Sequence, residues 1–295
     1  ALELHKKSLE LARKANDVRT EIFALNNMGV VYRRLDENTT ALNYHFQALK
    51  LAEKVKDDYS ASVSLNSIGN IHIALGNYAD AIKYFEQCLP LAYKANNNLG
   101  IAMNLNNIGE AYESLGILDS AESYYQKSLG YNEKIRSMKG IAISYNSLGN
   151  ISRMQKKFSE AVDLYKKALN INKEIGDMIY TSITYNRLGE VYFLQKKLQD
   201  AEIMFRKGLE LANEIGSKPE AKTAYEGLMK VNEMKGNLSQ ALEYSKLFKL
   251  YGDSLALENN NRYVRQMEAI YQNEKEHLRL LNIVILAICL KQLLT

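Results

Sequence analysis

The sequence is poor in the residues that interrupt or cross-link a chain. Its 295 residues include two prolines, two cysteines and no tryptophan. The two cysteines, Cys88 and Cys289, provide neither the framework of a disulfide-rich scaffold nor a metal-binding knuckle. Because proline is scarce and only 16 residues are glycine, the composition favours a mostly helical protein.

A strong charge of either sign is also missing. The formal net charge is +4, and no concentrated basic face argues for a nucleic-acid partner. The four histidines, His5, His45, His72 and His277, show no metal-ligand spacing. No glycine-rich phosphate loop and no nucleophile elbow occur. The sequence therefore predicts a protein that is not an enzyme and has no metal or cofactor.

What the sequence does contain is a repeat of 40 residues. Five glycines recur at this spacing, in phrases such as LNNMGVVY and YNRLGEVY: Gly29, Gly69, Gly109, Gly149 and Gly189. An alanine follows each glycine by twelve residues, and a sixth alanine keeps the register although Met229 stands in place of its glycine: Ala41, Ala81, Ala121, Ala161, Ala201 and Ala241. Such a fixed period is the sequence signature of a repeat architecture.

Each repeat reads as two helices. Apolar residues on either side of a polar break follow the helical period, which places helices at about 59–75 and 78–96 in the second repeat. A glycine within a helix costs about 1 kcal/mol relative to alanine. Its recurrence indicates that the partner helix approaches too closely for a side chain. One such hairpin cannot bury its own apolar face, so the hairpins must stack.

With aromatic residues such as Tyr32, Tyr112 and Phe85 at matching positions, the chain resembles tetratricopeptide repeat proteins. The period is that of the longer variants in kinesin light chains, Pins-type polarity scaffolds and bacterial signalling proteins. The resemblance implies an all-α, α-α superhelix of antiparallel hairpins over residues 1–252. We expect a half repeat at 1–17 and repeats at about 18–57, 58–97, 98–137, 138–177, 178–217 and a degenerate 218–252. The sequence departs from the family in lacking tryptophan and the proline that closes the second helix.

The same register accounts for the first residue. Ala1 and His5 precede Ala41 and His45 by one period, so the chain begins at the second helix of a repeat. We therefore expect the natural protein to extend further toward the N-terminus.

The resemblance places the first helix of each repeat on a concave, ligand-binding surface. Two positions four residues apart share a face there. The first holds Asn26, Asn66, Asn106, Asn146 and Asn186, and the second holds Val30, Asn70, Glu110, Asn150, Glu190 and Lys230. An asparagine offers a donor and an acceptor, which a peptide backbone needs, and similar asparagines grip peptides in kinesin light chains. The alternative is that each asparagine bonds the neighbouring repeat.

Charged residues on this surface change sign along the array: Arg33, Glu113, Arg153, Arg187, Glu190 and Lys230. A mixed groove suits a ligand with apolar and charged side chains, and the alternative is a solvated face. The predicted binding residues are Asn66, Asn70, Asn106, Glu110, Asn146, Asn150, Arg153, Asn186, Arg187 and Glu190.

The last 43 residues differ from the repeats. A charged helix, expected at 253–279, would cap the solenoid or act as a linker. Residues 280–295 contain the apolar run LLNIVILAICL, which is shorter than the roughly 20 residues of a membrane span. This run is either the start of an altered or truncated span or a buried capping helix. The order of segments resembles the sensor regions of Bacteroidetes-type membrane-bound regulators.

These features predict a module that binds a protein or extended peptide, as the sensor or interaction region of a larger bacterial signalling protein. The alternative is a constitutive scaffold for complex assembly with no signalling role. The resemblance of the tail implies the periplasmic face of a membrane-anchored protein, with attachment through 280–294, and the alternative is a cytoplasmic protein. A homodimer through the C-terminal helix is a further expectation.

Overall fold

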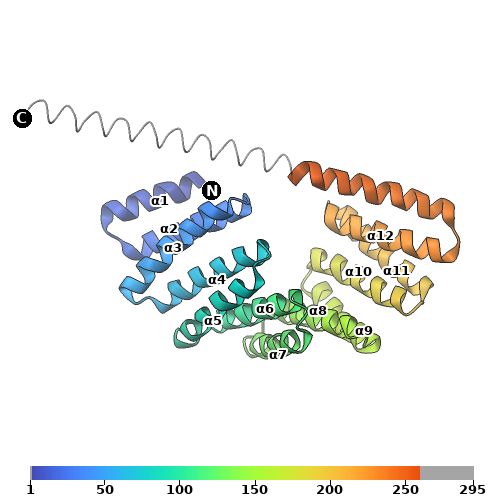
Figure 1. Ribbon diagram of the computed structural model, residues 1–295, viewed down its shortest axis with the longest axis horizontal. Coiled ribbons are helices and arrows are strands. Elements are labelled where there is room, and N and C mark those ends of the chain that lie inside the picture. Colours follow the sequence, from blue (N-terminus) through green and yellow to red (C-terminus); the bar gives the residue numbers. More distant parts are fainter. Residues whose placement is uncertain (1, 260–295) are drawn as a thin grey trace, which may run out of the picture.

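A computed structural model describes residues 2–259 of the chain. Every regular element in this part is an α-helix, which confirms the all-α prediction (Figure 1). The numbered helices are α1 (Leu2–Ala15), α2 (Val18–Arg34), α3 (Asn38–Val55), α4 (Asp58–Ala74), α5 (Tyr78–Lys94), α6 (Asn98–Ser114), α7 (Leu118–Lys134), α8 (Met138–Met154), α9 (Phe158–Glu174), α10 (Met178–Leu194), α11 (Leu198–Glu214) and α12 (Lys218–Lys235). A last helix is described over residues 238–259.

The turns between helices are built identically along the chain. One residue in each turn adopts a left-handed backbone conformation with a φ between 52° and 79°, and these residues recur every twenty positions from Asn16 to Gly236. A residue in this conformation ends the helix, because the N–H groups that follow can bond the last free carbonyls of that helix. Asp17 then begins α2, since its carboxylate accepts a hydrogen bond from the backbone N–H of Thr20 at 3.1 Å. Asp57, Asn97, Ser137 and Asp177 cap α4, α6, α8 and α10 in the same way.

The glycine of each repeat lies against an aromatic ring of the partner helix. A Cβ atom added to Gly69 would lie 2.4 Å from the ring of Phe85, and one added to Gly149 would lie 2.7 Å from the ring of Tyr165. Gly29 is in the same position relative to His45, which occupies an aromatic site and is fully buried. The expectation that the glycines permit close helix approach is therefore confirmed. Met229 lacks such a role, and Gly227 lies against Phe205 instead.

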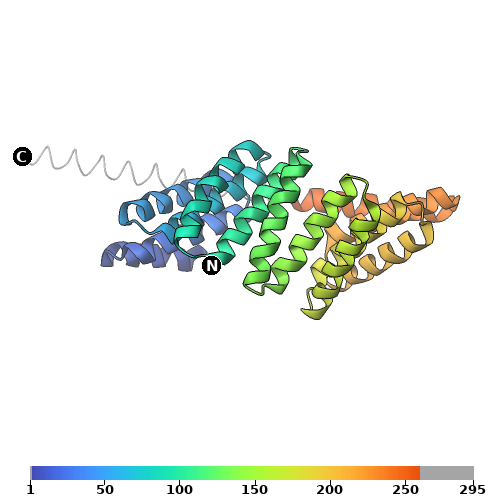
Figure 2. The same ribbon diagram turned by 90° about the horizontal axis from the view of Figure 1, so that it is seen from below.

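The helix pairs follow one another in a single curved row (Figures 1 and 2). Backbones of successive even-numbered helices, from α2 to α12, come within 8 Å of one another. The odd-numbered helices instead meet through long side chains such as Phe46 and Tyr84. Because the even-numbered helices are closer together, they form the inner side of the arc, with α5, α7 and α9 outside (Figure 1).

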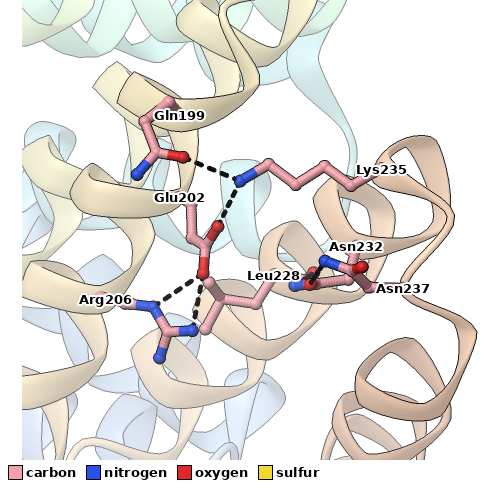
Figure 3. A network of polar contacts seen from close by, with 7 residues as sticks. All are labelled: Gln199, Glu202, Arg206, Leu228, Asn232, Lys235 and Asn237. Atoms are coloured by element: carbon pink, nitrogen blue, oxygen red, sulfur yellow. Dashed lines mark hydrogen bonds and ion pairs between the residues drawn. The ribbon is translucent and has the colours of Figure 1, made fainter.

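A polar network joins the last two numbered helices (Figure 3). The Nζ atom of Lys235 donates to Glu202 Oε2 at 2.5 Å and to Gln199 Oε1 at 3.1 Å. Glu202 also accepts two hydrogen bonds from Arg206, at 2.6 and 3.0 Å. Two repeats earlier the same positions hold Gln155 and Glu122, which are bonded at 3.1 Å. In these two repeats the contacts fix the end of the inner helix, α8 or α12, to the preceding outer helix, α7 or α11.

Beyond α12, Tyr244 and Phe248 of the last helix pack on Ala221 and Tyr225. Within residues 2–259, no helix is long and apolar enough to cross a membrane. The predictions for residues 260–279 and for the apolar segment 280–295 lie outside the described residues.

Candidate functional site: the concave surface

We define the concave surface as the solvent-facing side of α2, α4, α6, α8, α10 and α12. Each of these helices buries one face on its outer partner, so the opposite face points into the arc (Figure 1). On α6, for example, Ile108 is buried, whereas Met103 on the opposite side is 50% exposed. A ligand inside the arc would meet several repeats at once.

The first set of asparagines lies between neighbouring inner helices. Asn26 Nδ2 donates to Ser64 Oγ at 3.0 Å, and Asn66 Nδ2 donates to Asn104 Oδ1 at 3.0 Å. In the fourth repeat, Asn146 Oδ1 accepts from Thr184 Oγ1 at 3.1 Å. Each bond joins residues 38 positions apart, which is one repeat minus two.

The remaining members of this set are held less regularly. Asn186 Nδ2 donates to the backbone carbonyl of Glu220 at 3.1 Å, because Ala224 follows where the other repeats have a polar residue. Asn106 is half-buried, and its Oδ1 atom is buried without a hydrogen-bond partner. The side chains of Asn26, Asn66, Asn146 and Asn186 thus form the inter-repeat bonds that the architectural alternative requires.

The second set lies at the surface, where polar side chains link four inner helices, from α4 to α10. Asn107 Nδ2 donates to Asn70 Oδ1 at 3.0 Å between α6 and α4. The next link runs from α6 to α8, where Asn150 Nδ2 donates to Glu113 Oε1.

The chain of contacts continues from α8 to α10. Arg153 Nη2 donates to Asn150 Oδ1 at 2.7 Å, and its Nη1 forms an ion pair with Glu190 Oε1 at 3.3 Å. Because these side chains bond one another at the surface, they are available to exchange partners with a ligand.

A cavity of about 570 Å³ opens on the concave surface between α8, α10 and α12. Five of the predicted binding residues line it: Asn150, Arg153, Asn186, Arg187 and Glu190. Ile183, Phe193, Leu194 and Phe205 contribute apolar walls, while Glu226 and Lys230 add an ion pair at 2.5 Å. The other five predicted residues, Asn66, Asn70, Asn106, Glu110 and Asn146, do not line this cavity. The predicted site is therefore divided between this cavity and the earlier repeats.

Two charged side chains on the concave surface, Glu110 and Arg187, form no ion pair among the described contacts. Glu110 is exposed, yet the surrounding walls of the arc desolvate it and raise its pKa above the ordinary value, with a smaller contribution from Glu113. Arg187 donates to the backbone carbonyl of Asn146 at 3.1 Å and has no ion-pair partner in the described part. Below the surface, the hydroxyl of Tyr165 is buried without a hydrogen bond.

Among residues 2–259, no group of three or more histidine, cysteine, aspartate or glutamate side chains could hold a metal ion. Cys88 is buried, and burial raises the pKa of its thiol to about 11. A thiol with so high a pKa is a poor nucleophile at neutral pH.

Sequence reasoning missed a row of apolar side chains beside the asparagines. Five of them are more than half or about half exposed: Phe23, Tyr59, Leu99, Met103 and Ile179. Val63, Ile143 and Ile183 continue the row as partly buried residues. We call these eight residues the apolar stripe. Its signal is present in the sequence, because the position six before each glycine is apolar in all five regular repeats.

The chain belongs to the tetratricopeptide repeat family, whose model matches residues 17–94, 59–134, 100–174 and 180–246. These segments together span most of the chain. The comparison with curated proteins finds no match.

Solved structures show the same fold at low sequence identity. The tetratricopeptide repeat sensor protein of the STAND class from Pyrococcus horikoshii superposes with a TM-score of 0.71 at 19% identity, covering 87% of this chain and 41% of that one. The apo form of RapI gives 0.65 at 16% identity, covering 86% and 98%. A Rap protein in complex with competence and sporulation factor gives 0.59 at 18% identity, covering 86% and 70%.

Proposed function

We propose that this chain is a non-enzymatic module that binds an extended peptide, or an extended segment of a protein, on its concave surface. The observation that carries the proposal is the 570 Å³ cavity between α8, α10 and α12. It combines apolar walls with charged and amide side chains, which is the usual composition of a ligand site. The cavity is open to the arc, so a chain lying in it can continue along the surface.

Surface residues supply the polar contacts in this proposal. Asn70, Asn150 and Glu190 offer donors and acceptors for a peptide backbone, and Arg153 and Arg187 offer charge. We assign Asn66, Asn106, Asn146 and Asn186 a supporting role beneath them, in which they set the spacing of the helices. Glu110 contributes a carboxylate further along the surface.

We further propose that the module is the sensor or interaction region of a larger bacterial signalling protein. A sensor must bind its ligand reversibly. On this surface the side chains bond one another, so these bonds can form again when a ligand dissociates. The fold is shared with a protein described as having a tetratricopeptide repeat sensor and with a Rap protein bound to competence and sporulation factor. A constitutive scaffold would instead hold its partner at all times and carry no signal.

Selection of random 12-residue peptides displayed on phage tests the proposal. Peptides that bind the native chain should lose at least tenfold in affinity for Asn150→Ala and for Glu190→Ala. The control is Asp163→Ala on the outer helix α9, where an exposed carboxylate has no partner among the described contacts. Peptides that bind all three variants equally would show that they bind elsewhere, and the proposal would be wrong.

A further inference from the structure

The concave surface is divided lengthwise into two chemically different halves. The apolar stripe follows the N-terminal halves of the inner helices, from Phe23 on α2 to Ile183 on α10. On α6 the C-terminal half of this side is instead polar. On α6 the two halves are Leu99 and Met103 on one side and Glu110 and Glu113 on the other. Met103 and Glu110 are seven residues apart, which is two turns or about 10 Å along the helix.

The apolar half is large for a surface without a partner. The side chains of Phe23, Tyr59 and Leu99 are 66%, 56% and 53% exposed, and Ile179 is 54% exposed. Single exposed apolar residues are ordinary, but a row across five neighbouring helices is typical of an interaction surface. Its length also indicates what covers it. Four steps of about 8–10 Å between packed helices give about 32–40 Å, and 10–12 extended residues span that length at about 3.3 Å each.

In the third repeat, the polar half carries two glutamates that form no ion pair with a lysine or arginine among the described contacts. Glu113 accepts hydrogen bonds from the neutral side chains of Tyr125, at 2.7 Å, and Asn150. Glu110 has no hydrogen bond or ion pair among the described contacts, and desolvation by the surrounding arc raises its pKa. By contrast, the neighbouring acids are already neutralised, since Glu190 pairs with Arg153 and Glu226 with Lys230. Among the described contacts, α6 therefore presents two carboxylates to the concave surface, Glu110 and Glu113, without an ion-paired cation.

An extended chain can satisfy both halves at once. Its successive side chains point to opposite sides. A segment lying along the arc therefore directs one set of side chains toward the apolar stripe and the other toward Glu110 and Glu113. A helix of 12 residues would reach only about 18 Å and cover half of the stripe.

Resting on the proposed function, we infer that the ligand is an extended segment with large apolar side chains on alternate positions and a lysine or arginine near its centre. The apolar side chains lie on the apolar stripe, and the cation pairs with Glu110. The proposed function states only that a peptide binds, whereas this inference also gives the chemical class of that peptide.

Three fluorescein-labelled pools of synthetic 12-residue peptides test the inference by fluorescence anisotropy. The first pool has leucine, isoleucine, methionine or phenylalanine at alternate positions, serine or threonine between them, and lysine at position six. The second replaces this lysine with glutamate, and the third replaces the apolar residues with serine, threonine and asparagine. We expect the first pool to bind at least tenfold more tightly than either of the others.

Two variants locate the preferences. Glu110→Gln should abolish the advantage of lysine over glutamate, and Met103→Ser should reduce the advantage of the apolar pool severalfold. Matched controls are Glu133→Gln on α7, an exposed glutamate, and Ile203→Ser on α11, where the isoleucine is 40% exposed on the outer side. Both controls should keep the native preferences. All four side chains are exposed, so the variants are expected to fold, and circular dichroism verifies it.

The possible results separate this inference from the proposed function. Equal or tighter binding of the second or third pool overturns the inference. If that binding is weakened by Asn150→Ala and Glu190→Ala, the concave surface still binds peptides and only the ligand class is wrong. Absence of binding by all three pools also overturns the inference, and the phage selection then decides the proposed function separately.

Discussion

The substitution Asn146→Ala separates architecture from ligand binding in the asparagine ladder. Asn146 is 3% exposed, and its side chain joins two repeats. Its Oδ1 atom accepts from Thr184 Oγ1 at 3.1 Å, and its Nδ2 atom donates to the Ala142 carbonyl at 3.2 Å. A ligand on the concave surface has little access to a side chain so deeply placed.

The expected loss of stability follows from these contacts. A buried hydrogen bond contributes about 0.5–1.5 kcal/mol net, and an unfilled space left by the amide adds a similar amount. Because Thr184 can still donate to the carbonyl of Tyr180, at 2.7 Å, its hydroxyl is not left unsatisfied. We therefore expect a loss of about 1–3 kcal/mol in the free energy of unfolding. For a chain of this size, 2 kcal/mol corresponds to about 4–8 °C in melting temperature.

The assay is thermal unfolding followed by circular dichroism, together with the affinity for a selected peptide. Asn150→Ala is the matched comparison, because Asn150 is half-buried at the surface. It should lose less than about 1 kcal/mol of stability and most of its peptide affinity. If Asn146→Ala melts within 1 °C of the native chain and loses peptide binding tenfold, the ladder is part of the binding surface and this reasoning is wrong.

Three further predictions concern packing and charge. Gly149→Ala should destabilise the chain by more than about 2 kcal/mol, because the new methyl would overlap the ring of Tyr165. Gly130→Ala should instead stabilise it by about 0.5–1 kcal/mol, since Gly130 is helical with open space around its Cα; urea titrations measure both, and equal effects would contradict the packing account. Burial lowers the pKa of His45 to about 4, so only the unfolded state gains its proton as the pH falls from about 6.5 toward 4. Native stability should therefore drop over this range by up to about 3 kcal/mol, and His45→Phe should remove that part of the pH dependence; an unchanged profile would show that His45 is not its source. Glu110 has a raised pKa, so its ionised form costs stability at neutral pH; Glu110→Gln should raise the melting temperature slightly at pH 7 and not at pH 4, and a lower melting temperature at pH 7 would mean that the carboxylate is already paired.

The architecture could be predicted from the sequence because the same pattern of glycine, alanine and apolar positions recurs in every regular repeat. The period of the glycines defines the hairpins, and the ring against each glycine, such as Phe85 against Gly69, explains why the glycine recurs. The N-terminal caps of the inner helices can be predicted in the same way, since Asp17 and Asp57 are one repeat apart. Local rules of this kind need no knowledge of distant contacts.

The sequence also indicates that the asparagine ladder joins neighbouring repeats. The partners of the asparagines are Ser64, Asn104 and Thr184, and polar residues at this position stop at Ala224. A buried polar position that ends together with the regular asparagines indicates pairing between repeats. Five of the eight residues of the apolar stripe are likewise visible in the sequence, because they lie six positions before each glycine.

The details of the cavity could not be predicted. Its position depends on Gly227, which replaces larger residues of other repeats and lies against Phe205. Whether Arg153 serves a ligand or pairs with Glu190 depends on how close two repeats lie, and in the folded chain its Nη1 atom is 3.3 Å from Glu190 Oε1. Spacing along the sequence does not contain such distances.

Photo-cross-linking tests most directly whether the concave surface is the binding site. A photoreactive phenylalanine derivative would replace either Met103 on the concave side of α6 or Ile203 on the outer side of α11, two apolar residues that are 50% and 40% exposed. A peptide selected on the native chain should cross-link from position 103 and not from position 203. Cross-linking from position 203 that equals or exceeds that from position 103 would contradict the account.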